Sequence, residues 1–148
     1  MAQILVIEDE QDIRENIIET LQLNGFDVQG AKDGERGLML AKSTHPDLVI
    51  CDIMMPGMDG FAVLAAMRED DSLAAVPFIF LTALADQDSM RHGMNDGADD
   101  YIVKPYATQD LVAAVHSRLR RAEAIMDEAH HQIDELHAHL YTMVENDL

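Results

Sequence analysis

The chain alternates between short apolar runs rich in β-branched residues and longer segments in which apolar side chains recur at helical spacing. The runs predict strands over Ile4–Ile7, Val28–Ala31, Leu48–Cys51, Phe78–Leu81 and Tyr101–Val103. The segments between them predict helices over Asp12–Leu23, Gly34–Lys42, Gly60–Arg68 and Asp86–Asn95, and from Thr108 onward. Five strands that alternate strictly with five helices predict a parallel sheet covered by helices on both faces.

Polar residues suited to phosphate or metal chemistry follow the predicted strands. They are Glu8 and Asp9 after the first strand, Asp52 at the end of the third, Thr82 at the end of the fourth, and Lys104-Pro105 after the fifth. Open parallel sheets bind ligands outside the carboxyl ends of their strands. A doubly wound, flavodoxin-like α/β fold with strand order 2-1-3-4-5 would make the first and third strands neighbours.

That strand order would crowd Glu8, Asp9 and Asp52 into one small pocket. Three carboxylates a few ångströms apart repel one another strongly in a partly buried site. A divalent cation resolves this conflict. Mg²⁺ is the expected ion, because it prefers oxygen ligands and commonly bridges carboxylates to a phosphate.

The motifs at these positions resemble the receiver domain of two-component response regulators, in order and in spacing. The resemblance covers about residues 1–120 and rests on four segments: Ile7-Glu8-Asp9-Glu10, Asp52-Ile53-Met54-Met55-Pro56-Gly57-Met58-Asp59-Gly60, Leu81-Thr82-Ala83 and Gly97-Ala98-Asp99-Asp100-Tyr101-Ile102-Val103-Lys104-Pro105. Each segment alone is common, but the ordered set is specific.

The resemblance implies a role for each site residue. Asp52 would be the phosphoacceptor, and the Mg²⁺ ligands would be Asp9, Asp52, the backbone carbonyl of Met54, and Glu8 acting through a water. Thr82 and Lys104 would bind the phosphoryl oxygens. The switch residues would be Thr82, Tyr101 and Pro105, the last in a cis peptide bond with Lys104. The phosphoryl donor would be a sensor histidine kinase or a phosphotransfer protein, and the chain would turn over only its own phosphate.

Two other classes of protein with related folds are disfavoured. A flavodoxin-like electron carrier needs a phosphate cradle after the first strand, where this chain has the acidic Glu8-Asp9-Glu10. A haloacid-dehalogenase-type phosphatase needs a second aspartate two residues after the nucleophile, where this chain has Met54. A thioether metal site at the methionines after Asp52 is also disfavoured, because oxygen ligands dominate there.

Composition limits the size and the partners of the protein. A chain of 148 residues, 48% of them hydrophobic, suits one domain with a modest extension. The formal net charge of -18 repels phosphate backbones and anionic membranes, and no lysine or arginine follows Arg121. We therefore expect no direct nucleic-acid binding and no membrane association.

The single cysteine and the first residues of the chain indicate in which cellular compartment the protein lies. Cys51 cannot form an intramolecular disulfide, and we expect it to be buried and inert. Residues 1–6 lack the features of a secretory signal, and no apolar run approaches the ~20 residues of a membrane span. We expect a cytoplasmic protein, whether Leu148 is its natural end or a boundary within a longer regulator.

The residues after the receiver segment have a heptad pattern. Apolar side chains fall at a positions Leu119, Met126, Ile133 and Leu140 and at d positions Ala122, Ala129, Leu136 and Met143. We expect a receiver domain over 1–120 and a helical extension over 121–148, which continues the fifth helix and forms a parallel coiled-coil homodimer. The alternative is a single amphipathic helix folded back on the receiver.

Overall fold

The computed structural model of the chain describes residues 1–83 and 97–146, and side chains up to Glu128 in the last helix. Its elements in order are β1 (Gln3–Ile7), α1 (Gln11–Leu23), β2 (Asp27–Ala31), α2 (Gly34–Thr44), β3 (Leu48–Asp52), α3 (Gly60–Glu69), β4 (Phe78–Thr82), β5 (Asp100–Val103) and α5 (Thr108–Asn146). Each predicted strand lies within an observed one. The helix predicted over Asp86–Asn95 lies outside the described residues.

The described strands form one parallel sheet in the order β2-β1-β3-β4-β5. This confirms the flavodoxin-like doubly wound fold. The register pairs Ile7 with Cys51 and Asp52 with Leu81, so the ends of β1, β3 and β4 lie side by side. The predicted site residues therefore meet at one edge of the sheet.

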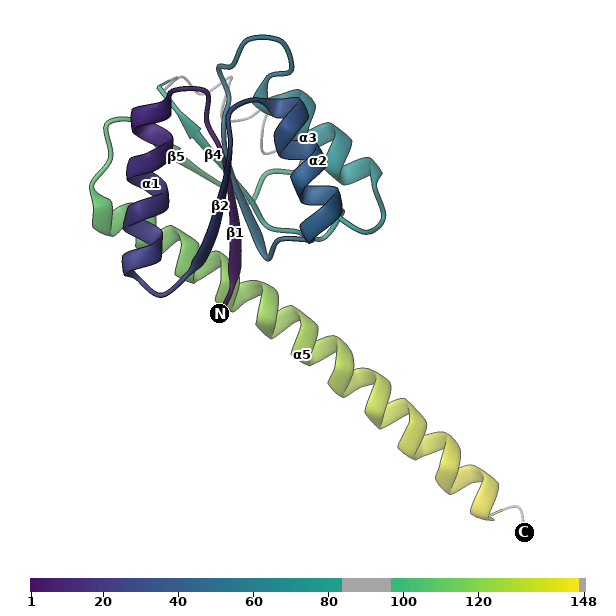
Figure 1. Ribbon diagram of the computed structural model, residues 1–148. Helices are drawn as coiled ribbons and strands as arrows, with labels where there is room; N and C mark the ends of the chain where they lie inside the picture. The colour runs from purple at the N-terminus through teal and green to yellow at the C-terminus, as the bar shows by residue number, and fades with distance from the viewer. Residues whose placement is uncertain (84–96, 147–148) are drawn as a thin grey trace.

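Two hydrophobic layers cover the two faces of the sheet. Helices α2 and α3 pack on one face over a core that includes Val49, Cys51 and Phe80. Helices α1 and α5 pack on the other face over Ile50 and Leu81 (Figure 1). Because both faces are buried, every residue of β3 and β4 is buried, which explains their unbroken apolar runs.

Aspartates begin two of the helices near the carboxyl edge. The Asp33 carboxylate accepts a hydrogen bond from the Arg36 backbone N–H at 2.7 Å at the start of α2. Asp59, within the motif after β3, accepts one from the Ala62 N–H at 2.9 Å at the start of α3. These caps satisfy N–H groups that the first turn of a helix leaves without partners. Asp59 is therefore accounted for by helix capping.

Helix α5 is 39 residues long and extends well beyond the sheet. Its first part packs against the receiver core through Leu111 and Val115, and its remainder projects away from the domain (Figure 1). This course supports a long C-terminal helix that continues from the receiver. No helix among the described residues is long and apolar enough to cross a membrane.

Candidate functional site

An acidic pocket lies at the adjacent ends of β1 and β3. Glu8 and Asp52 are 0% and 5% exposed, respectively, whereas Asp9 is not buried. One carboxylate oxygen from each of Glu8, Asp9 and Asp52 lies within 4.8 Å of the other two. The fold thus brings together the three carboxylates that the sequence predicted would meet.

Lys104 reaches this pocket from the end of β5. Its Nζ atom lies 3.3 Å from Asp52 Oδ2 and 3.4 Å from Glu8 Oε2. Burial alone would lower the pKa of Lys104, but the charges of Asp52 and Glu8 outweigh it, so the pKa lies above its usual value. The ammonium therefore stays charged between the two buried carboxylates. The peptide bond between Lys104 and Pro105 is cis, as expected.

Glu8 carries an unusual protonation equilibrium. Burial raises its pKa from 4.5 to about 7, with a further contribution from the hydrogen bond and charge of Asp52 and an opposing one from Lys104. Besides burial, the Asp52 carboxylate disfavours ionisation of Glu8, and the single Lys104 ammonium offsets these effects only in part. The pocket is therefore suited to a second cation.

Thr82 and Tyr101 lie on the neighbouring strands β4 and β5. Thr82 is fully buried at the end of β4, one residue beyond the register partner of Asp52. Tyr101 is half-buried, and its ring lies 5.5 Å from that of Phe80, measured between centroids. A buried hydroxyl group and a half-buried aromatic ring thus lie on the two strands that follow β3 in the sheet.

The loop after β3 folds tightly around Asp52. The Met54 backbone N–H donates to Asp52 Oδ1 at 3.3 Å. The start of α3 lies so close that a Cβ atom added to Gly60 would be 2.5 Å from the carbonyl oxygen of Asp52 and 2.8 Å from the Cα of Ile53. Only glycine allows this approach, because backbone atoms cannot move aside as a flexible side chain can.

Two further residues lie beside the pocket. Arg14 of α1 donates through Nη1 to the backbone carbonyl of Glu8 at 2.8 Å, and no local signal predicts this contact between a helix and the end of a strand. Cys51 is fully buried next to Asp52, and burial raises the pKa of its thiol well above the usual value. The burial of Cys51 confirms its expected place in a strand, and its lack of reactivity stays a prediction.

Comparison with known proteins decides the family. Residues 4–116 match the model of the response regulator receiver domain. The chain belongs to this family. The receiver is 30% identical to the Vibrio cholerae chemotaxis protein CheY4, with a TM-score of 0.77 over 80% of this chain and 98% of that one. It is 31% identical to a response regulator receiver domain protein from Clostridium thermocellum, with a TM-score of 0.79 over 84% and 99% of the two chains.

The curated relatives are longer regulators. The receiver is 39% identical to the DNA-binding dual master transcriptional regulator RpaA of Synechocystis sp., over 88% of this chain and 54% of that protein. It is 45% identical to the probable transcriptional regulator ycf27 of Porphyridium aerugineum, over 82% and 49%. It is 40% identical to the DNA-binding response regulator MtrA of Mycolicibacterium smegmatis, over 82% and 52%. The chain thus spans about half the length of these relatives.

Proposed function

We propose that this receiver accepts a phosphoryl group on Asp52 from a sensor histidine kinase or a phosphotransfer protein. The observation that carries the proposal is the pairing of Asp52 with Lys104 at 3.3 Å, beside two further carboxylates at the carboxyl edge of the sheet. An acidic nucleophile next to a fixed ammonium is suited to phosphoryl transfer, since the transferred group is itself anionic.

The acidic pocket fits Mg²⁺. Three carboxylates share it with one ammonium, and their oxygens lie within 4.8 Å of one another, as a small hard cation requires. We assign Asp9, Asp52 and the Met54 carbonyl as direct ligands and Glu8 as a ligand through a water. When bound, the ion would neutralise charge on the phosphoryl oxygens.

The chain's own residues perform the transfer. An Oδ atom of Asp52 forms the new bond to phosphorus while the bond from phosphorus to the donor breaks, and the donor leaves with that electron pair. The product is an acyl phosphate on Asp52. Lys104 and the Thr82 hydroxyl bind its oxygens, and the chain hydrolyses only this acyl phosphate of its own.

Phosphorylation changes the surface through the switch residues Thr82, Tyr101 and Pro105. The new group adds roughly -1.5 to -2 charge at the end of β3. Thr82 moves toward it, and the half-buried Tyr101 ring fills the space that Thr82 leaves. A local change of charge becomes a change in the face formed by β5 and the adjacent loops, which controls a partner or an output module.

We further propose that the receiver over 1–120 is joined to a coiled-coil extension over 121–148 that forms a parallel homodimer. Support comes from the described start of the seam: Met126 is 63% exposed on a helix that leaves the domain, and Ile125 beside it is 59% exposed. Large apolar side chains exposed on a projecting helix favour pairing. We also propose that the protein is cytoplasmic, in the same compartment as the phosphoryl donor domain of the histidine kinase.

Intact mass after incubation with acetyl phosphate tests the proposal. The wild-type chain should gain one phosphate with Mg²⁺ present and none in excess chelator. Asp52→Asn should abolish the gain, whereas Asp27→Asn, an exposed aspartate at the opposite end of the sheet, should not. Phosphate uptake by Asp52→Asn, or equal uptake in chelator, would contradict the assignment.

A further inference from the structure

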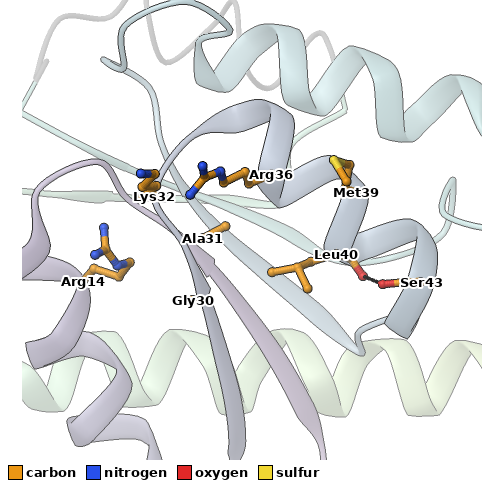
Figure 2. Close-up of a pocket in the computed structure, with 8 residues that line it drawn as sticks. All are labelled: Arg14, Gly30, Ala31, Lys32, Arg36, Met39, Leu40 and Ser43. Atoms are coloured by element: carbon orange, nitrogen blue, oxygen red, sulfur yellow. Dashed lines mark hydrogen bonds between the residues drawn. The ribbon is translucent and has the colours of Figure 1, made fainter.

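A groove separate from the acidic pocket runs along the open edge of the sheet. It has a volume of about 660 Å³ and lies between α1 and α2, with the end of β2 as its floor (Figure 2). Its lining residues are Arg14, Gly30, Ala31, Lys32, Arg36, Met39, Leu40 and Ser43. Binding sites of small molecules and short peptides have volumes in this range.

The charge of this groove is opposite to that of the protein. The chain has 28 acidic and only 10 basic residues, yet Arg14, Lys32 and Arg36 all line this one groove. Their charged groups point toward one another across it (Figure 2). Three like charges converge at a cost unless an anion offsets them, and among the described residues Asp33 is the only carboxylate that forms an ion pair with any of the three.

The three cations retain capacity to bind a ligand. Arg14 uses Nη1 for the Glu8 carbonyl, which fixes its guanidinium and leaves its other nitrogens facing the groove. The Arg36–Asp33 pair is 3.7 Å long and exposed on both sides, so it is weak. Among the described residues, Lys32 forms no ion pair.

The floor of the groove offers backbone hydrogen-bonding groups. Strand β2 is at the end of the sheet and pairs only with β1. The Asp27 N–H donates to Ala2, and the Ala31 carbonyl accepts from Glu8, so alternate residues of β2 face β1. The N–H and C=O groups of Val28 and Gly30 consequently point to the open edge. Such an edge can pair with an added strand.

Glycine at position 30 makes room for side chains of α1 over the floor of the groove. A Cβ atom there would lie 2.6 Å from Ile18 Cδ1 and 3.2 Å from Arg14 Cδ. Its absence lets the Arg14 side chain lie across the strand. Apolar side chains of α2 complete the groove, since Leu40 is half-buried in its wall and Met39 is 70% exposed.

We infer that this groove binds an extended acidic segment of a partner protein, in which carboxylate and apolar side chains alternate. The segment pairs its backbone with the free edge of β2. Its carboxylates bind Arg14, Lys32 and Arg36, and its apolar side chains contact Met39 and Leu40. A small inorganic anion would use only the cations, whereas an acidic peptide uses the cations, the strand edge and the apolar wall together.

A titration of the ¹⁵N-labelled chain with the acetylated, amidated peptide Glu-Val-Glu-Val-Glu tests the inference. The amide signals of Val28 and Gly30 should shift in wild-type protein. The double variant Lys32→Gln/Arg36→Gln should bind about tenfold more weakly, because it loses two charge-assisted contacts. The double variant Arg120→Gln/Arg121→Gln removes the same charge from exposed positions on α5 and should bind like the wild type.

Several results would overturn the inference. One is the absence of peptide-induced shifts in β2, and another is equal binding by the two double variants. A third is binding of pyrophosphate at these cations with no binding of the peptide, which would indicate a small-anion site. A fourth is a combined result: the wild type binds no peptide, and Lys32→Gln/Arg36→Gln self-associates in sedimentation. That result would show that the cations only prevent the β2 edges of two chains from pairing.

Discussion

The Nζ atom of Lys104 lies 3.3 Å from Oδ2 of Asp52, although 52 residues separate them in the chain. The same nitrogen lies 3.4 Å from Oε2 of Glu8, which is fully buried. One ammonium therefore holds two buried carboxylates together at the edge of the sheet. Most of the behaviour expected of the site follows from this arrangement.

Lys104→Met should destabilise the chain mainly when Mg²⁺ is absent. Removing the ammonium leaves Glu8 and Asp52 buried without their cation, which should lower the free energy of unfolding by about 3 kcal/mol in chelator. Mg²⁺ should restore most of the loss by neutralising the same carboxylates. Urea unfolding at pH 8 with EDTA and with Mg²⁺ measures both values. Lys42→Met, which removes an exposed lysine, is the control. An equal loss in EDTA and in Mg²⁺ for Lys104→Met would contradict the claim that Lys104 and Mg²⁺ neutralise the same carboxylates.

Glu8 should make Mg²⁺ affinity and stability depend on pH in opposite directions. Its folded-state pKa of about 7 lies above the ordinary 4.5, so the folded chain holds the proton more tightly than the unfolded chain. Without metal, the contribution of Glu8 to the free energy of unfolding should therefore be greatest below about pH 4.5. It should be lost as the pH rises through about 7. Mg²⁺ affinity should rise over the same interval, since the ion competes with the proton.

Thermal unfolding in EDTA and calorimetric Mg²⁺ titrations across this pH range would measure both effects. Glu8→Gln should flatten both dependences relative to the wild type. Glu35→Gln, which removes an exposed glutamate, should leave them unchanged. If Glu8→Gln kept the wild-type dependence on pH, another group would have to be responsible.

Gly60→Ala should disturb the site through the backbone. The added methyl group would lie 2.5 Å from the Asp52 carbonyl oxygen, so α3 or the end of β3 must shift. We expect a loss of about 2–3 kcal/mol in the free energy of unfolding and slower phosphorylation. Gly25→Ala is the comparison, because its Cβ would meet nothing within 4 Å and only its φ of 89° is unfavourable, at a cost of about 1 kcal/mol. Equal losses of unfolding free energy in Gly60→Ala and Gly25→Ala would contradict the close approach of Gly60 to the Asp52 backbone.

The fold was predictable from sequence because each strand is a short apolar run that ends at a polar residue. The predicted strand Leu48–Cys51, for example, is one residue shorter than the observed Leu48–Asp52. The site was predictable in outline for the same reason, since parallel strands place Glu8 and Asp52 at a common edge.

Contacts between distant segments could not be predicted. Asp99 is part of the segment before β5, but only the structure shows that its carboxylate accepts from the Phe78 N–H at 2.7 Å and pairs with Arg68 at 3.3 Å. Arg68 also donates to the carbonyls of Val76 and Gly97. These bonds fix the entries to β4 and β5, and they depend on the tertiary arrangement rather than on local spacing. The groove at the edge of β2 was missed because its cations come from separate elements.

Truncation after Arg121 should convert a dimer into a monomer. The proposed seam begins at Leu119, and most of its larger apolar residues, including Ile133 and Leu140, follow the cut. Light scattering on the intact and truncated chains measures the change, and Met126→Glu should weaken the intact dimer by placing charges at the seam. A dimer that survives truncation would indicate pairing through the receiver, and an intact chain that is monomeric at high micromolar concentration would contradict the coiled coil.

The most direct measurement of the central claim locates the phosphate. Borohydride reduces an acyl phosphate on aspartate to homoserine, so the chain is incubated with acetyl phosphate and Mg²⁺, reduced and mapped by peptide mass spectrometry. We predict homoserine at position 52, and none when the phosphoryl donor or Mg²⁺ is omitted. Homoserine at Asp9 or at any other aspartate, with Asp52 unmodified, would contradict the assignment of Asp52 as the phosphoacceptor.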